Sequence, residues 1–466
     1  MATRRAPIRS SSRSVKRTDR SGRNEPRTAR WLSAALGMIG CILIAQPALS
    51  QYFGQNKVQY ESFDFKVLRT DHFDVYFYPE ERASAELAGR MAERWYARLS
   101  RYLGHELSGR QPLLLYASHP DFEQTNALSG VLGEGTGGVT EALKRRIVLP
   151  LAGPLAETDH VIGHELVHAF QYDITGEGRS VATDSPVLTR LPLWFVEGMA
   201  EYASIGPRDP QTAMWMRDAT ARDDLPDLGK LASNRYFPYR YGQAFLSFVA
   251  GTFGDDAIGR ILQAPGRHGT IELGMKEALG ADPDSVVKAW HRALHGQFDP
   301  WRDRLHPATD YGARILGEPE TGRLQVGPVV SPDGRKMLLF SERDRFAINL
   351  FVIDVKTGDV LRRLSRNEVD PHFESLLFIR SAGSWAPDSR RVVFPAITRG
   401  RPELVIMDTE TGERLREIRF SELGEIYDPA WSPDGRTIAF SALASGMTDL
   451  FVYDLQEDRL ERWTDD

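Results

Sequence analysis

A five-residue turn occurs three times in the C-terminal third of the sequence, and this repetition constrains the fold more than any other feature. The copies are Ser331–Arg335, Ala386–Arg390 and Ser432–Arg436, which begin 55 and then 46 residues apart. Each Pro-Asp-Gly or Pro-Asp-Ser favours a tight turn, and an apolar strand follows it. A second strand then ends in an aspartate, namely Asp354, Asp408 and Asp454. A repeat of this length is typical of propeller blades, so residues 322–466 are expected to form an all-β propeller.

These repeats resemble TolB-type, WD-repeat-like β-propellers. Three blades are recognisable in residues 322–466, whereas propellers typically close with roughly four to eight. The propeller is therefore expected to be incomplete. Either the sequence is the N-terminal part of a longer protein, which is the favoured interpretation, or another chain completes the ring.

The second informative motif is His164-Glu165-Leu166-Val167-His168. On an α-helix, residues four apart lie on one face, so both imidazoles can reach the same metal ion. Glu165 follows the first histidine, where its carboxylate can hold and deprotonate a metal-bound water. The alternative is an amphipathic helix with two half-buried histidines.

A third metal ligand is available in the apolar segment Leu193–Tyr202. Catalytic zinc usually takes three protein ligands, and Glu197 can supply the missing one from a neighbouring helix. Glu201, one turn further on, can accept the free ring N–H of a ligating histidine. The alternative is a solvated acidic face, but buried carboxylates among apolar neighbours need a partner.

Together, H-E-x-x-H and W-x-x-E-G-x-A-E-Y resemble the gluzincin metallopeptidases of the peptidase MA clan, which include thermolysin and the aminopeptidase N family. The resemblance implies an α+β metallopeptidase domain, Zn²⁺ as cofactor, and Glu165 as general base. The implied zinc ligands are His164, His168 and Glu197. It also implies that Tyr239, in Tyr239-Arg240-Tyr241-Gly242, stabilises the oxyanion, although Tyr241 stands where the family has lysine. Packing of Tyr239 on Phe245 is the alternative.

Two further features surround the motif. The resemblance suggests that Gly135–Glu141 and Arg146–Pro150 form an edge of the cleft, because glycines let a substrate backbone approach and a strand edge can pair with a peptide. A surface hairpin is the alternative. His160 lies one turn before His164, too far along the helix to join the same metal, and is expected to support the ligands or to be structural.

The N-terminus predicts export. Residues 1–30 carry ten basic and two acidic side chains, whereas Trp31–Ser50 is uncharged. The apolar stretch Trp31–Ala45 is short for a membrane span but suits a signal-peptide core. Residues 1–50 are therefore interpreted as a basic leader and signal peptide of a periplasmic or secreted protein. An uncleaved N-terminal membrane anchor is the alternative.

The net charge of the chain disfavours some classes of binding partner. The chain has a net charge of −6, and removing the basic leader leaves residues 51–466 with 48 basic and 62 acidic side chains. This acidic balance disfavours nucleic acid or an anionic membrane surface as partner. The only cysteine, Cys41, lies in the leader, so the mature chain offers no thiol chemistry.

The predicted organisation is multidomain. A metallopeptidase-like domain is expected over residues 51–300, with a linker at 301–321 before the propeller. Helical spacing and length predict helices over residues 80–103, 192–205, 239–253, 255–264, 270–279 and 282–296.

The leading functional hypothesis is an exported zinc peptidase that acts on a peptide or protein substrate, with the propeller docking protein partners or limiting substrate access. The alternative is a periplasmic binding or scaffold protein whose propeller is the functional part and whose peptidase-like domain is inactive. A third hypothesis is zinc-dependent hydrolysis of a non-peptide bond, such as an amide in cell-wall material.

Overall fold

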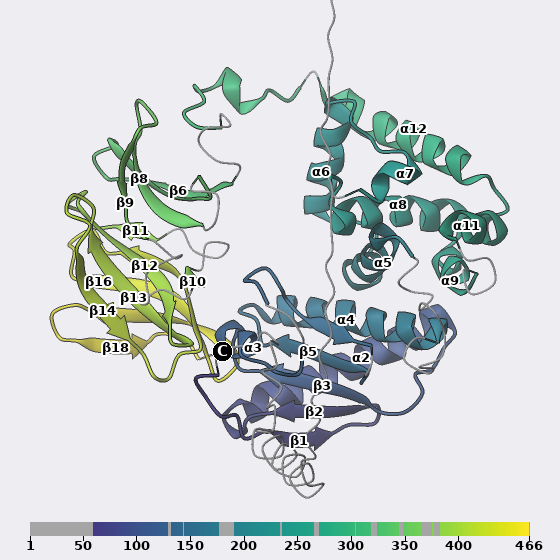
Figure 1. Cartoon of the computed structure of the whole chain (residues 1–466), viewed down its shortest axis with the longest axis horizontal. Helices are drawn as coiled ribbons and strands as arrows, with labels where there is room; N and C mark the ends of the chain where they lie inside the picture. The colour runs from purple at the N-terminus through teal and green to yellow at the C-terminus, as the bar shows by residue number, and fades with distance from the viewer. Residues whose placement is uncertain are drawn as a thin grey trace, which may run out of the picture. The chain divides into compact units, whose positions relative to one another are not determined.

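The computed structural model describes residues 59–128, 132–142, 144–176, 191–233, 235–264, 270–302, 304–317, 324–343, 348–365, 375–376 and 383–465. The leader and signal segment proposed for residues 1–50 lies outside the described residues. Within the described ranges, no helix combines the length and the apolar character needed to cross a membrane. These ranges contain a mixed sheet with its helices, a helical region and three antiparallel sheets (Figure 1).

A five-stranded sheet has the order β1-β2-β3-β5-β4. Its strands are β1 (Lys66–Arg69), β2 (Phe73–Phe77), β3 (Gln111–Tyr116), β4 (Val139–Glu141) and β5 (Arg146–Pro150). Strands β2, β3 and β5 run parallel, whereas β1 and β4 run antiparallel to their neighbours. Strand β4 therefore forms one edge of the sheet, in agreement with the edge predicted for Gly135–Glu141. Arg146–Pro150, also expected at that edge, instead lies inside the sheet as β5, between β3 and β4.

Two helices cover one face of this sheet: α2 (Arg82–Leu103) and α4 (Leu155–Thr175), which carries the His-Glu-x-x-His motif. The short helix α3 (His119–Glu123) packs through Phe122 into a separate apolar cluster. The contact between α2 and α4 depends on Gly163, because a Cβ there would lie 2.6 Å from the ring of Trp95. The two helices consequently pack closely just before the first motif histidine.

The next part of the chain is helical, as the sequence predicts. Its helices are α5 (Leu193–Ile205), α6 (Pro210–Ala221), α7 (Leu228–Leu231), α8 (Pro238–Phe253), α9 (Asp256–Gln263), α11 (Ile271–Leu279) and α12 (Pro283–Arg302). Five of them match predicted helices, whereas α6 and the short α7 were not predicted. Helix α12 continues to Arg302, with Pro300 inside it, and so reaches into the segment interpreted as a linker.

Helices α5 and α8 meet at two glycines. A Cβ on Gly198 would lie 2.5 Å from the Gly242 backbone, and one on Gly242 would lie 2.0 Å from the carbonyl oxygen of Trp194. Nearby, the ring of Trp194 packs edge-on against Phe245, which packs against Trp290 of α12. The glycine contact fixes the first turns of α8 against the middle of α5.

The C-terminal part of the described chain forms two four-stranded sheets and a five-stranded one, with no closed barrel among the described strands. The first sheet contains β6 (Gln325–Val330), β7 (Lys336–Ser341), β8 (Asn349–Asp354) and β9 (Val360–Arg363). The second contains β10 (Ser375–Leu376), β11 (Ser384–Trp385), β12 (Arg391–Thr398), β13 (Arg401–Asp408) and β14 (Arg414–Arg419). The third contains β15 (Glu425–Trp431), β16 (Thr437–Ala444), β17 (Met447–Asp454) and β18 (Arg459–Arg462).

The repeated residues have the same role in each sheet. The three predicted turns follow β6, β11 and β15. The strand after each turn begins opposite the repeated aspartate: Lys336 pairs with Asp354, Arg391 with Asp408, and Thr437 with Asp454. Each aspartate then accepts hydrogen bonds, at 2.8 to 3.0 Å, from the backbone N–H groups two and three residues further on. These bonds close the turn into the last strand.

Candidate metal centre

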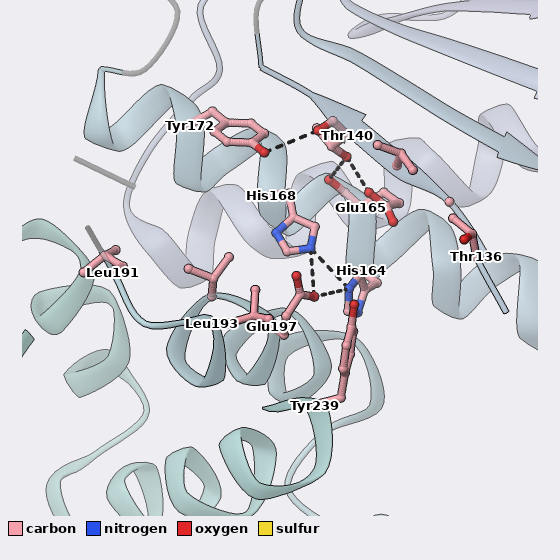
Figure 2. Close-up of a pocket in the computed structure, with 13 residues that line it drawn as sticks. Thr136, Thr140, His164, Glu165, His168, Tyr172, Leu191, Leu193, Glu197 and Tyr239 are labelled. Carbon is pink, nitrogen blue, oxygen red and sulfur yellow. Dashed lines mark hydrogen bonds and ion pairs between the residues drawn. The ribbon is translucent and has the colours of Figure 1, made fainter. Parts of the chain in front are cut away.

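Two neighbouring helices bring two histidines and a glutamate together (Figure 2). On α4, His164 and His168 lie one turn apart and are both buried. Their Nε2 atoms are 3.2 Å apart. Helix α5 presents Glu197, whose Oε2 lies 3.2 Å from Nε2 of His164 and 3.4 Å from Nε2 of His168. The structure therefore brings the three ligands predicted from the sequence into one group.

These separations fit a tetrahedral zinc ion. Zinc binds imidazole nitrogen and carboxylate oxygen at about 2.0–2.1 Å, which places two ligands at a tetrahedral angle about 3.3 Å apart. The measured separations of 3.2, 3.2 and 3.4 Å lie around that value. Two imidazoles and one carboxylate also make up a donor set that catalytic zinc sites use, with the fourth position left to solvent. The residues present thus fit the metal that the sequence implies.

The orientation of His168 is fixed by Gln171, which is fully buried. The carboxamide nitrogen of Gln171 donates to the backbone oxygen of Val196 at 2.9 Å. Its carboxamide oxygen therefore faces Nδ1 of His168, 2.8 Å away, and this nitrogen must carry the proton. The lone pair of Nε2 is then directed toward Glu197 and His164, as metal ligation requires.

The orientation of His164 involves Glu201. Oε1 of Glu201 lies 3.1 Å from Nδ1 of His164 and 3.4 Å from Nε2 of His160. Oε2 of Glu201 accepts a hydrogen bond from Arg240 at 3.1 Å. The guanidinium of Arg240 also reaches Asp209 at 3.3 Å, so it holds Glu201 in place from the side opposite the histidines.

The electrostatics of this cluster favour positive charge at its centre. Burial acts to lower the pKa of His164, but its contacts with Glu197 and Glu201 and the charges of Glu165 and Glu197 outweigh this effect and raise the pKa to about 10. Burial acts to raise the pKa of Glu201, yet its bonds to His160 and His164 lower it to about 2. The pKa of Glu197 is likewise held far below its usual value, against the effect of burial, by His164 and His168. Two carboxylates that stay ionised beside the imidazoles provide a setting suited to a cation.

Glu165 lies beside the ligands and is held by the edge strand. The hydroxyl of Thr140, on β4, lies 2.7 Å from Oε2 of Glu165 and 2.8 Å from its backbone oxygen. Gly138 leaves room for the same side chain, because a Cβ there would lie 2.9 Å from Cγ of Glu165. The strand edge therefore sets the position of the Glu165 carboxylate, for which the sequence predicts the role of general base.

Tyr239, at the start of α8, lies next to the histidines. Its ring stacks on that of His164, with centroids 5.8 Å apart and planes 18° from parallel. Burial, followed by the charges of Glu197 and Glu165, raises the pKa of Tyr239, so the hydroxyl remains protonated and can donate at neutral pH. The neighbouring Tyr241 points elsewhere and packs against Tyr236, with ring centroids 5.2 Å apart.

A cavity of about 610 Å³ opens onto these groups. Figure 2 shows Leu191 and Leu193 on one side of the ligands and Thr136 on the other. Away from the ligands the lining combines apolar and hydroxyl-bearing side chains. The lining residues are Thr136, Gly138, Val139, Thr140, His164, Glu165, His168, Tyr172, Leu191, Leu193, Val196, Glu197 and Tyr239.

Sequence reasoning missed three supporting residues: Gln171, Thr140 and Arg240. Gln171 carried a readable signal, since it lies three and seven residues after the two histidines and so shares their helix face. Arg240 directly follows Tyr239, in the segment that the resemblance singles out. Thr140 carried no such signal, because its contact with Glu165 joins a strand to a helix.

No protein family model matches the chain. The solved structures that resemble it include TolB from Acinetobacter baumannii, with 22% identity and a TM-score of 0.26, over 32% of this chain and 34% of that chain. A putative TolB from Agrobacterium tumefaciens has 20% identity and a TM-score of 0.24, over 29% and 45% of the two chains. The β-propeller domain of the Trilobed protease from Pyrococcus furiosus has 18% identity and a TM-score of 0.23, over 30% and 43%.

Two of these solved structures are TolB proteins and the third is a β-propeller domain, and each likeness covers about a third of this chain or less. The chain spans less than half the length of each of them.

Proposed function

We propose that this protein is an exported, zinc-dependent peptidase. The observation that carries the proposal is the group formed by His164, His168 and Glu197, whose donor atoms are spaced as tetrahedral zinc requires. Glu165 lies beside this group and faces the same cavity. A basic and then apolar leader at residues 1–50 supports export.

Each side chain has a defined task in peptide hydrolysis. Zinc held by the three ligands would supply Lewis acidity toward water and the scissile carbonyl. Glu165 accepts a proton from the attacking water and passes it to the leaving amine. The protonated hydroxyl of Tyr239 donates to the oxygen of the tetrahedral intermediate, a kind of interaction worth about 3–4 kcal/mol in other enzymes. Thr140 keeps the Glu165 carboxylate in place.

The test is to purify the protein, measure its metal content and follow the cleavage of a mixture of peptides. We expect about one zinc ion per chain and loss of cleavage in Glu165→Gln, with the zinc retained. Glu272→Gln, the same change on the exposed face of α11, should keep full activity. Undiminished cleavage by Glu165→Gln would exclude this mechanism.

We further propose a role for the propeller sheets: residues 322–466 dock protein partners or limit the access of substrates. Residues 51–466 carry a net acidic charge, which fits protein partners better than nucleic acid or an anionic membrane surface.

Export is tested separately by sequencing the N-terminus of the secreted or periplasmic protein, which we expect to begin near Gln51. Retention of Trp31–Ala45 would indicate a membrane anchor instead.

A further inference from the structure

The metal centre lies between two cavities rather than at the end of one. The first is the 610 Å³ cavity that continues toward Leu191 and Leu193. The second, of about 400 Å³, continues toward Phe237 and Arg240. They share the residues at the centre, which are Thr136, Gly138, His164, Glu165 and Tyr239. A substrate bound at the centre can therefore extend in both directions.

One chain segment runs along both cavities. Residues 135–138 line the second cavity, and residues 136 and 138–140 line the first. The last of these belong to β4, the edge strand of the sheet. Strand β4 is extended at the sheet edge, and an extended peptide, which rises about 3.3 Å per residue, can lie alongside it. Glycines at 135, 137 and 138 leave the part of the segment that precedes the strand without bulky side chains.

An enzyme that removes terminal residues must capture the terminus, and a charged side chain does this directly: an acid pairs with an ammonium and a base pairs with a carboxylate. Apart from the ligands and Glu165, the charged side chains that line the described walls of the two cavities are His160, Glu201 and Arg240. These three are the only candidates for such a capture site in the described lining.

All three are already engaged with one another or with the ligands. Glu201, whose side chain is 5% exposed, contacts His160, His164 and Arg240. Arg240 also binds Asp209 and donates to Gln211 at 2.9 Å. Capturing a terminus with these three side chains would require breaking these contacts, so the described lining offers no uncommitted charged side chain for a free ammonium or carboxylate.

We infer that the protein is an endopeptidase, which binds an internal stretch of polypeptide across both cavities and needs no free terminus. This inference rests on the proposed peptidase function. In the reaction, the C–N bond of an internal amide breaks, the hydroxyl of water joins the acyl carbon and its hydrogen goes to the amine, so that two shorter peptides leave.

The test compares two peptides of identical sequence, one with free termini and one with an acetylated N-terminus and an amidated C-terminus, with products identified by mass spectrometry. We expect both to be cut at the same internal bond, at rates within about two-fold of each other. Stepwise loss of terminal residues from the free peptide alone would overturn the inference while leaving the peptidase function intact. Cleavage of neither peptide by the zinc-loaded protein would overturn the proposed function and this inference with it.

A second measurement probes the two sides separately. Leu193 and Phe237 line opposite cavities and are 56% and 43% exposed, so truncating either should leave the fold intact. Leu193→Ala and Phe237→Ala should each raise KM for the blocked peptide several-fold, whereas Leu273→Ala, an equally exposed leucine on α11, should not. When Leu193→Ala or Phe237→Ala is combined with Glu165→Gln, the double variant should bind the blocked peptide more weakly than Glu165→Gln alone. An effect confined to one of the two cavities would contradict endopeptidase action.

Discussion

Gln171 connects the metal ligand His168 to the helix that carries the next ligand. Its carboxamide oxygen lies 2.8 Å from Nδ1 of His168, and its carboxamide nitrogen donates to the oxygen of Val196, the residue before Glu197. One buried side chain thus couples the ring of His168 to the position of Glu197. This arrangement stabilises the ligand geometry across two helices.

Replacing Gln171 by methionine, which has a similar length but no carboxamide, should lower zinc affinity. Loss of such a supporting hydrogen bond typically costs about 10- to 100-fold in metal affinity. Competition with a chromophoric chelator measures this effect. Gln263→Met, at an exposed position of α9, is the matched control and should bind zinc normally. Equal affinities for the two variants would argue against the role assigned to Gln171.

Thr140→Val should reduce kcat by about ten-fold, equivalent to about 1.4 kcal/mol in the barrier. Valine keeps the shape of threonine but removes the hydroxyl that lies 2.7 Å from Oε2 of Glu165. Thr140→Ser retains the hydroxyl and should recover most of the activity. Zinc content and KM should change little in either variant, and failure of serine to rescue kcat would show that Thr140 acts through packing alone.

Tyr239→Phe should lower kcat by roughly 100-fold, as the removal of a single oxyanion donor does in other hydrolases. The ring that stacks on His164 is kept, so zinc affinity should be unchanged. Steady-state kinetics and a zinc titration on the same preparation separate the two effects. If activity persists, the alternative in which Tyr239 is only a packing residue is correct.

Zinc binding should release protons. The pKa of His164 is raised to about 10 in the metal-free protein, so the ring is protonated near neutral pH, whereas a metal ligand must be neutral. Metal and proton therefore compete, and zinc affinity should increase with pH as the solution approaches that pKa. Calorimetric titrations in two buffers with different ionisation enthalpies should report about one proton released per ion. Identical heats in both buffers would refute this expectation.

Gly198→Ala should destabilise the helical region, because the new Cβ would lie 2.5 Å from the backbone of Gly242. Overpacking of this kind typically costs about 1–3 kcal/mol of unfolding free energy. Gly251→Ala, on α8 with open space around the position, is the control and should be neutral or slightly stabilising. Denaturant unfolding of both variants measures the difference.

The predicted helices include some with an apolar stripe and others, such as α5, that are apolar on most sides, and α6 shows why another helix was missed. It begins with favourable signals, since the side chain of Asp209 caps the helix by accepting from the N–H of Thr212 and Pro210 occupies its first position. Its buried residues, however, include Thr212 and Thr220, which do not stand out in a hydrophobic pattern. Periodicity was present, but it was carried by small and polar side chains.

The candidate ligands were predictable because the helix period alone places His164 and His168 on one face. Adding Glu197 required a second helix, and the apolar residues around it supplied that signal. The contact of Thr140 with Glu165 could not be predicted, because it depends on how β4 packs against α4. Local periodicity identifies the side chains that share one face of a helix or strand. Their partners on other helices and strands depend on tertiary packing.

The aspartates that close the turns, at positions 354, 408 and 454, have a consequence for how the propeller sheets diversify. Each one fixes the pairing of its two strands through hydrogen bonds to residues two and three positions away. The hydrogen bonds that close each turn therefore lie within one sheet, whereas the apolar cores are shared between neighbouring sheets. Gene duplication or deletion can add or remove one such sheet while the turns of the remaining sheets keep their geometry. The number of blades can therefore change readily in this architecture.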